Sequence, residues 1–218
     1  MTKPVKPVLS LQAFQRMPYY LQYLKELYRN GVLTTSSPAV SAHFGFTEIQ
    51  VRKDFAAVCS SRGIPRHGFD TKQLIDDIET LLGYRNTNDA VLVGAGVFGS
   101  ALLQYKDLSK YGMQIVAGFD IKEALVGKPL HGKPVFHASK ITELCRRMKI
   151  HIGIITVPAE QAQAVCDLLI SGGILAIWNF APVHLSVPDD ILVQNENPAV
   201  SLALLSRHLQ ERLLNGEV

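Results

Sequence analysis

Apolar residues recur at helical spacing in two segments of the first 85 residues. The first segment spans residues 18–29 and is followed by Asn30-Gly31, residue types that commonly end a helix. The second spans about residues 71–82 and is followed by Gly83. These patterns predict two helices, each with one buried face.

Two shorter helices are expected between them. Ser36-Ser37-Pro38 supplies a hydroxyl N-cap and a proline for the first helical turn, and this segment ends at Gly45. Residues 47–50 read Thr-Glu-Ile-Gln, which matches the capping box and predicts a helix to about Val58. Two short helices around a glycine turn are typical of a helix-turn-helix.

Beyond residue 84 the pattern changes to short apolar strands that alternate with helices. A polar run over 84–89 is typical of a linker, and strands are predicted at 90–93, 115–119, 150–157 and 174–179, with a terminal helix over 198–214. This alternation favours an α/β fold with a parallel sheet. We expect three parts: a helix-turn-helix domain over 1–84, a parallel-sheet domain over 85–197 and a C-terminal helix over 198–218.

The composition is that of an ordinary globular protein, with 47% hydrophobic and 19% charged residues among 218. The N-terminal segment lacks the apolar core of a signal peptide, and no stretch of about 18 apolar residues could span a bilayer. We therefore expect a cytoplasmic protein without a membrane partner. Its three cysteines show no C-x-x-C spacing, so no metal is expected.

Charge is distributed unevenly along the chain. Residues 1–70 hold nine lysines and arginines and four acids, a net charge of +5, which leaves −2 for the rest of the total of +3. A basic N-terminal part joined to a slightly acidic C-terminal part is typical of a nucleic-acid reader joined to a small-molecule sensor.

The third helix carries the residue types of a DNA-recognition helix. Gln50, Arg52 and Lys53 would be exposed, where they could meet base edges or phosphates, while Ile49, Val51 and Phe55 would face the core. Residues 61–69 combine turn formers with basic residues, as a wing would. The candidate DNA-binding residues are Ser36, Ser37, Gln50, Arg52, Lys53, Arg62, Arg66 and His67. The alternative is that these charges form a solvated helix face.

Residues 94–99 read G-A-G-V-F-G and lie between a predicted strand and a predicted helix. In that context Gly94 permits a tight turn, Gly96 lets the backbone approach a pyrophosphate, and Gly99 allows the helix to pack on the strand. Phosphates would then sit on the amides at the helix N-terminus. The motif predicts a Rossmann dinucleotide site formed by Gly94, Ala95, Gly96, Val97, Phe98 and Gly99.

Asp120 ends the second strand, where its carboxylate could accept hydrogen bonds from the adenosine ribose. It would repel a 2′-phosphate, so NAD(H) is expected in preference to NADP(H). The alternative is an ordinary surface acid. The histidines at 131, 137, 151, 184 and 208 have no paired acid at a recognisable spacing, which argues against an enzyme.

Taken together, these motifs resemble the Rex family of NADH-sensing bacterial transcriptional repressors, and the resemblance covers the whole chain. It is carried by residues 16–20, 50–54, 94–99, 119–120, 153–159 with Gln163, and 179–182. It implies a winged helix on operator DNA, a homodimer with a C-terminal helix exchanged between subunits, and NAD and NADH as cofactors. NADH would release the operator, so that gene expression follows the NADH/NAD ratio.

The resemblance also assigns residues at the nicotinamide end. It implies that Thr156, Val157 and Pro158 line the far side of the pocket near the nicotinamide ribose, and that Asn179, Phe180 and Ala181 close it. Tyr105, in the helix after the glycine loop, and Arg16 correspond to the family's redox switch. Their partner in the family is an acid, in whose place this chain has Asn197, so Arg16 would lack that charge partner.

Residues 56–62, the wing at 65–69 and the start of the terminal helix at 201–206 depart from the family pattern. Two alternatives therefore stay open. One is a Rex paralogue that binds NAD(H) with weakened DNA binding. The other is a small NAD-dependent oxidoreductase or CoA-binding-like protein.

Overall fold

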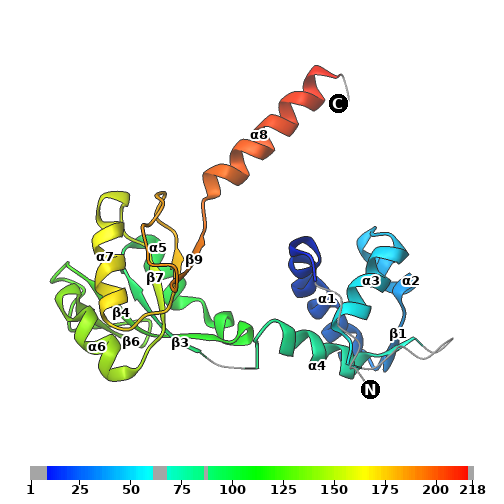
Figure 1. The fold of residues 1–218 in the computed structure, drawn as a ribbon, viewed down its shortest axis with the longest axis horizontal. Helices are drawn as coiled ribbons and strands as arrows, with labels where there is room; N and C mark the ends of the chain where they lie inside the picture. Colours follow the sequence, from blue (N-terminus) through cyan, green and yellow to red (C-terminus); the bar gives the residue numbers. More distant parts are fainter. Residues whose placement is uncertain (1–8, 61–67, 86–87, 216–218) are drawn as a thin grey trace. The chain divides into compact units, whose positions relative to one another are not determined.

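The computed structural model describes residues 9–60, 68–85 and 88–215. The chain divides into two compact units, residues 1–86 and 87–218 (Figure 1). Each unit has its own buried apolar core. The wing residues Arg62, Arg66 and His67 lie outside the described residues.

The described residues of the N-terminal unit form four helices and a short two-stranded sheet. The elements are α1 (Leu11–Arg29), β1 (Thr34–Thr35), α2 (Ser37–Phe44), α3 (Glu48–Val58), β2 (Phe69–Asp70) and α4 (Thr71–Leu81). β1 pairs antiparallel with β2. The core is formed mainly by Met17, Tyr20, Leu24, Val51, Phe55, Leu74 and Ile78.

Helix α1 begins earlier than the sequence predicted. It starts at Leu11, with the Ser10 hydroxyl accepting a hydrogen bond from the Ala13 amide, and it contains Pro18 in its interior. The prediction began at Pro18 because a proline inside a helix normally breaks the pattern. Here the buried side chains of Ala13 and Met17 continue the apolar face of the helix N-terminal to the proline.

The predicted helix-turn-helix is present as α2 and α3. Ser36 caps α2 and Thr47 caps α3, each accepting a hydrogen bond from the amide three residues later. Gly45 ends α2 with φ of 68°, the left-handed conformation that glycine adopts without strain. The capping residues therefore fix both ends of the turn.

The C-terminal unit is built on a seven-stranded sheet in the order β5-β6-β4-β3-β7-β8-β9, which is parallel except for β5. The strands are β3 (Asn88–Val93), β4 (Met113–Asp120), β5 (Pro129–Leu130), β6 (Lys133–His137), β7 (Ile152–Ile155), β8 (Ala176–Asn179) and β9 (Leu192–Asn195). The helices are α5 (Val97–Gln104), η1 (Lys106–Tyr111), η2 (Ala138–Lys140), α6 (Ile141–Met148), α7 (Ala159–Ser171) and α8 (Pro198–Leu214). The strand order outward from β3 in both directions is that of a Rossmann fold.

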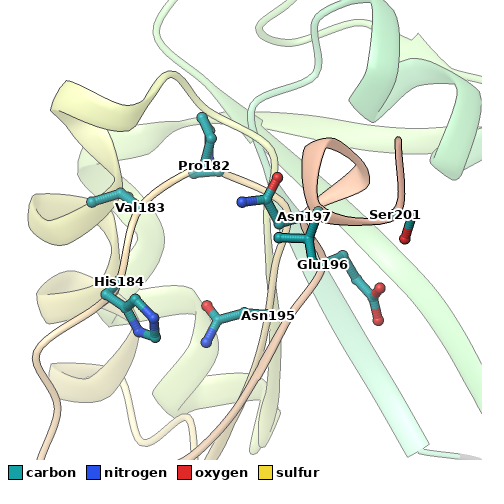
Figure 2. A pocket seen from close by; sticks show the side chains of 9 residues that line it. Pro182, Val183, His184, Asn195, Glu196, Asn197 and Ser201 are labelled. Atoms are coloured by element: carbon teal, nitrogen blue, oxygen red, sulfur yellow. The ribbon is translucent and has the colours of Figure 1, made fainter. Parts of the chain in front are cut away.

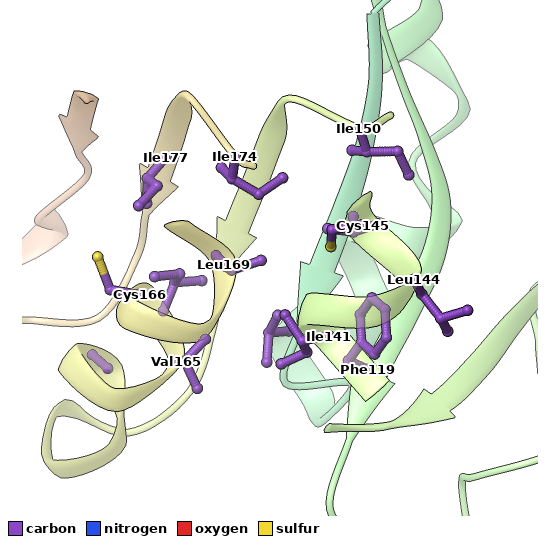
Figure 3. Close-up of a cluster of buried hydrophobic side chains, with 14 of the residues drawn as sticks. Phe119, Ile141, Leu144, Cys145, Ile150, Val165, Cys166, Leu169, Ile174 and Ile177 are labelled. Atoms are coloured by element: carbon purple, nitrogen blue, oxygen red, sulfur yellow. The ribbon is translucent and has the colours of Figure 1, made fainter. Parts of the chain in front are cut away.

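Both faces of this sheet are covered. Along β3, Val91 and Val93 pack with helices α6 and α7, while Ala90 and Leu92 pack with Leu103 of α5. The larger cluster is shown in Figure 3, where Cys145 and Cys166 lie among branched aliphatic side chains and Phe119. Strands buried on both faces are continuous apolar runs, which is why β3, β4, β7 and β8 were predictable.

The register of the sheet brings the site-bearing ends of four strands into line. Val93 pairs with Phe119 on one side and with Ile155 on the other, and Ile155 pairs with Asn179. The residues that follow these positions therefore emerge together at one edge of the sheet. In doubly wound sheets, ligands bind at this carboxyl edge, beside the point where the strand order reverses.

Helix α8 has the predicted bounds and differs from the other α-helices of the described residues in having no buried residue. Seven large apolar side chains along it are between 53% and 79% exposed, including Leu205 and Leu214. In the part of the chain that the structure describes, no helix is both long enough and apolar enough to cross a membrane.

Candidate nucleotide and DNA sites

The glycine loop after β3 is tightly folded onto the strand ends. Gly94 has φ of 100°, and a side chain there would meet the Thr156 carbonyl group at 2.9 Å. A side chain at Gly99 would lie 1.9 Å from the Gly94 carbonyl oxygen. These two glycines are therefore required by packing and backbone conformation.

Gly96 lies in different surroundings. It is exposed, has φ of −66°, and no atom lies within 4 Å of where its Cβ would stand. It precedes α5, whose N-terminus has no side-chain cap, so the first amides of that helix are available to an anion. The fold leaves open the space above Gly96 that a pyrophosphate would need.

Thr156 fixes the loop from the neighbouring strand. Its hydroxyl donates to the Gly94 carbonyl at 2.8 Å, with the Val93 carbonyl at 3.0 Å as a second acceptor. Its amide donates to the same Val93 carbonyl at 2.9 Å. The resemblance implied a place for Thr156 near the nicotinamide ribose, whereas its hydroxyl serves the glycine loop.

Asp120 is 7% exposed and is held by two backbone amides. Oδ2 accepts from the Ala95 amide at 2.7 Å, and Oδ1 accepts from the Lys122 amide at 2.9 Å. The carboxylate therefore holds the glycine loop and the end of β4 together. An ordinary surface acid would not be buried and hydrogen-bonded in this way. Each oxygen retains lone-pair capacity for a further donor such as a ribose hydroxyl.

A cavity of about 280 Å³ joins these groups. It is lined by Val93, Gly94, Gly96, Asp120, Ile121, Lys122, Ala138, Thr156, Val157, Pro158, Gln161 and Val165. Val157 and Pro158 thus share one cavity with Asp120. The sequence motifs did not single out Ile121, Lys122, Ala138, Gln161 or Val165, which reach the site only because β4, β6 and β7 end at the same edge.

Two of the residues predicted to contact the cofactor have buried side chains. The Ala95 methyl group is buried beneath the loop. The Asn179 side chain is fully buried; its amide nitrogen donates to the Val183 carbonyl and to Asn195 Oδ1, and its oxygen accepts from the Ala181 amide. Asn179 therefore shapes the loop after β8.

The aromatic side chains beside the loop form a continuous row. Phe98, in the first turn of α5, packs against Phe180 with ring centroids 5.0 Å apart. Phe180 packs in turn against Trp178 at 4.7 Å. The Trp178 indole donates to Glu196 Oε1 at 3.2 Å, just before α8. The row connects the start of α5 with the start of α8.

A second cavity of about 430 Å³ lies at the β9–α8 junction (Figure 2). Its lining includes Pro182, Val183, His184, Asn195, Glu196, Asn197 and Ser201. Asn197 is the N-cap of α8, and its side-chain oxygen accepts from the Ala199 amide at 3.0 Å. Asn197 thus caps α8 as an aspartate at this position would.

Tyr105 lies one residue beyond α5, where it was expected inside that helix. It precedes η1 and is 47% exposed. The neighbouring Tyr111 phenol raises the pKa of Tyr105. Tyr105 has the exposure that a group reaching a ligand requires.

In the N-terminal unit, the outward face of α3 differs in one respect from the prediction. Val51 and Phe55 are buried as expected, but Ile49 is 64% exposed and lies on the same face as Arg52 and Lys53. The assignment of Ile49 to the core was therefore wrong. An exposed aliphatic side chain on a recognition helix is suited to contact a thymine methyl group.

The remaining candidate DNA residues have different surroundings. Gln50 is half-buried, Lys53 is exposed, and Arg52 is paired with Glu48 on the same helix. Ser36 is the cap of α2, whereas Ser37 is 5% exposed, which removes its hydroxyl from the surface.

Arg16 has a charge partner within its own unit. Its guanidinium donates to both Asp54 oxygens at 2.8 Å, and the Tyr20 hydroxyl donates to Asp54 Oδ2 at 2.9 Å. The hydrogen bonds that Arg16 donates to Asp54 raise the pKa of Arg16, and burial raises the pKa of Tyr20. Asp54 of α3 thus supplies a charge partner for Arg16, independently of the residue at position 197.

Comparisons with known proteins find a match for each of the two units. Residues 85–183 match the family model described as a CoA binding domain, and residues 9–56 match the one described as a putative DNA-binding protein N-terminus. The redox-sensing transcriptional repressor Rex of Bacteroides fragilis is 38% identical over 95% of this chain and 92% of its own length. Rex of Caldicellulosiruptor bescii is 35% identical over 97% of both chains.

Solved structures show the same similarity. RSP, described as a Rex-family repressor, was solved in complex with β-NAD⁺ and operator DNA; it is 33% identical, with a TM-score of 0.89 over 97% of both chains. Its complex with β-NADH has a TM-score of 0.83 at 32% identity, over 97% of this chain and 99% of RSP.

Proposed function

Because the chain belongs to the Rex family of redox-sensing transcriptional repressors, we propose that its C-terminal unit binds NAD⁺ or NADH while its N-terminal unit binds operator DNA. The protein is a regulator of transcription and not an enzyme. NADH releases the operator, so the dinucleotide acts as a signal. A cytoplasmic location follows from this proposal, since bacterial DNA lies there.

The observation that best supports dinucleotide binding is the joint arrangement of Gly96 and Asp120. Gly96 leaves open space before an uncapped helix N-terminus, and Asp120 is buried in the same cavity and held by the loop's own amide. A pyrophosphate would accept hydrogen bonds from α5 while the ribose hydroxyls donate to Asp120. A 2′-phosphate would meet the Asp120 charge, so NAD(H) is favoured over NADP(H).

DNA binding is assigned to the outward face of α3. Lys53 and Arg52 would neutralise phosphates or contact guanine, Gln50 would contact adenine, and Ile49 would pack against a thymine methyl group. The Glu48–Arg52 pair is exposed, so it costs little to exchange for a phosphate. In this proposal Ser36 approaches the DNA backbone and Ser37 does not.

We also propose a homodimer in which α8 packs on a second copy. A helix with seven exposed large apolar residues and none buried has no apolar surface of its own unit to cover it. Such a surface is typical of a protein interface. The resemblance to Rex supports exchange of this helix between subunits.

The test is operator binding with each redox form at one fixed salt concentration, because phosphate contacts make affinity depend steeply on salt. An operator-like duplex titrated by fluorescence anisotropy should bind tightly with NAD⁺ and be released by NADH. Equal affinity with both forms would contradict redox sensing. Tight NADH binding without any duplex binding would instead support the paralogue that has lost its DNA affinity.

A further inference from the structure

A lysine also lines the cavity in which Asp120 lies. Lys122 follows Asp120 by two residues and lines the same cavity, and its amide donates to the Asp120 carboxylate at 2.9 Å. Within the described part of the chain, the Lys122 ammonium makes no hydrogen bond or ion pair. Its side chain is exposed, whereas Asp120 is buried.

The two charges favour different forms of the adenosine ribose. Asp120 accepts from ribose hydroxyls and repels a 2′-phosphate, while a basic side chain near the end of this strand accommodates that phosphate in Rossmann proteins. Asp120 is fixed by two backbone hydrogen bonds and cannot turn away. Lys122 has a long, unpaired side chain that can move toward a phosphate dianion.

We propose that Lys122 sets how strictly this site excludes a 2′-phosphate, so that the protein accepts NADPH as a weaker second ligand. The inference rests on the proposed dinucleotide site. Asp120 keeps NADH the preferred ligand, and Lys122 narrows that preference by pairing with the 2′-phosphate at the edge of the cavity.

The experiment compares calorimetric titrations of the full-length protein with NADH and NADPH at one ionic strength. Lys122→Ala should weaken NADPH binding by about fivefold, as expected for an exposed ion pair worth about 1 kcal/mol. NADH binding should stay within about twofold because no 2′-phosphate is present. Lys122→Glu should increase the difference between the NADH and NADPH affinities further, since it adds a second carboxylate that repels the 2′-phosphate.

The matched control is Lys128→Ala, an exposed lysine in the same connection between β4 and β5 but outside the cavity lining. This substitution should leave the ratio of NADH and NADPH affinities unchanged. A parallel titration with ADP-ribose and its 2′-phosphate should give the same ratios, because the effect belongs to the adenosine end.

Several results would overturn the inference. Equal losses of NADH and NADPH would mean that Lys122 acts on the diphosphate, and NADPH binding too weak to measure would mean that Asp120 alone decides. If Lys128→Ala changed the ratio of NADH and NADPH affinities as much as Lys122→Ala does, the effect would come from the overall charge of the protein and not from a contact of Lys122 with the 2′-phosphate. If the parent protein bound neither dinucleotide, the proposed function itself would fail.

Discussion

Gly94, Gly96 and Gly99 lie in one short loop, yet each has different surroundings. Substitution at Gly94 or Gly99 would collide with backbone atoms, whereas a side chain at Gly96 meets nothing within 4 Å. The motif alone assigns three roles but cannot tell which glycine can be changed without harm to the fold. The structure makes Gly96 the position where ligand binding and folding can be separated.

Gly96→Val should therefore fold normally and fail to bind dinucleotide. Its φ of −66° suits valine, so the free energy of unfolding should change by no more than about 0.5 kcal/mol. The branched side chain would occupy the place of the pyrophosphate and cost about two phosphate–amide hydrogen bonds, or roughly 100-fold in NADH affinity. Calorimetry and thermal unfolding measure the two effects. The control is Gly99→Ala, which should lower the free energy of unfolding because its side chain collides with the Gly94 carbonyl oxygen. If Gly96→Val folded and still bound NADH normally, the glycine loop would not be the phosphate site.

Asp54 is the acceptor for two side chains of α1. Asp54→Ala would leave the Arg16 guanidinium and the Tyr20 hydroxyl without their acceptor in a largely buried place. Removing one partner of a buried pair is strongly destabilising, so unfolding in urea should show a loss of about 3 kcal/mol. The control is Glu48→Ala, which breaks the exposed pair with Arg52 on the same helix and should cost less than about 0.5 kcal/mol. Similar losses in both variants would show that the Asp54 cluster contributes little.

At the scale of the element, the sequence predicted strands and helices with strong local patterns. The strands buried on both faces and the capped helices α2, α3 and α8 were found close to their predicted bounds. Strands β6 and β9 lie near the two edges of the sheet and contain polar residues, as in Lys133–His137 and Leu192–Asn195. Their apolar runs are too short to identify, and they become strands because a neighbouring strand offers hydrogen-bond partners.

In the candidate site, too, the parts that carry a local sequence pattern were predicted and the parts that depend on long-range contacts were not. The glycine loop and Asp120 carry a local motif, so sequence reasoning found them. The Thr156 hydroxyl meets Gly94 across 62 residues of chain, and Arg16 meets Asp54 across 38. No periodicity reports such contacts, because they depend on how elements pack in three dimensions.

Helix α8 provides a prediction about assembly. Leu202, Leu205 and Leu209 are spaced by three and four residues, so they share one face of the helix, and each is more than half exposed. Leu205→Glu combined with Leu209→Glu should abolish the proposed homodimer, because two carboxylates would be buried in an apolar contact. Sedimentation should then give the mass of one chain instead of two. Arg207→Glu, on the opposite side of the helix, should remain dimeric, and a dimer in all three proteins would exclude α8 from the interface.

At the scale of the whole molecule, the question is how the loss or gain of a hydride reaches the DNA. Oxidised and reduced nicotinamide differ by one positive charge and in ring planarity. A ligand shifts a conformational equilibrium only through its different affinities for the two states, so the groups that discriminate must contact the nicotinamide. Arg16 is paired with Asp54 of α3, so the pair links α1 to the helix proposed to contact DNA.

Tyr105 is the group proposed to sense the nicotinamide, since it follows the glycine-loop helix and is 47% exposed. Tyr105→Phe keeps the ring and removes only the hydroxyl. If the hydroxyl forms a hydrogen bond with one redox state only, its loss removes about 1 kcal/mol of coupling, and the ratio of operator affinities with NAD⁺ and NADH should shrink about fivefold. Anisotropy titrations at fixed salt measure the ratio, while ADP-ribose binding and thermal unfolding should stay as in the parent. Tyr28→Phe, an exposed tyrosine of α1, controls for the loss of any phenol. A parent-like ratio in Tyr105→Phe would exclude its hydroxyl as the sensor and leave the discrimination to the row of Phe98, Phe180 and Trp178.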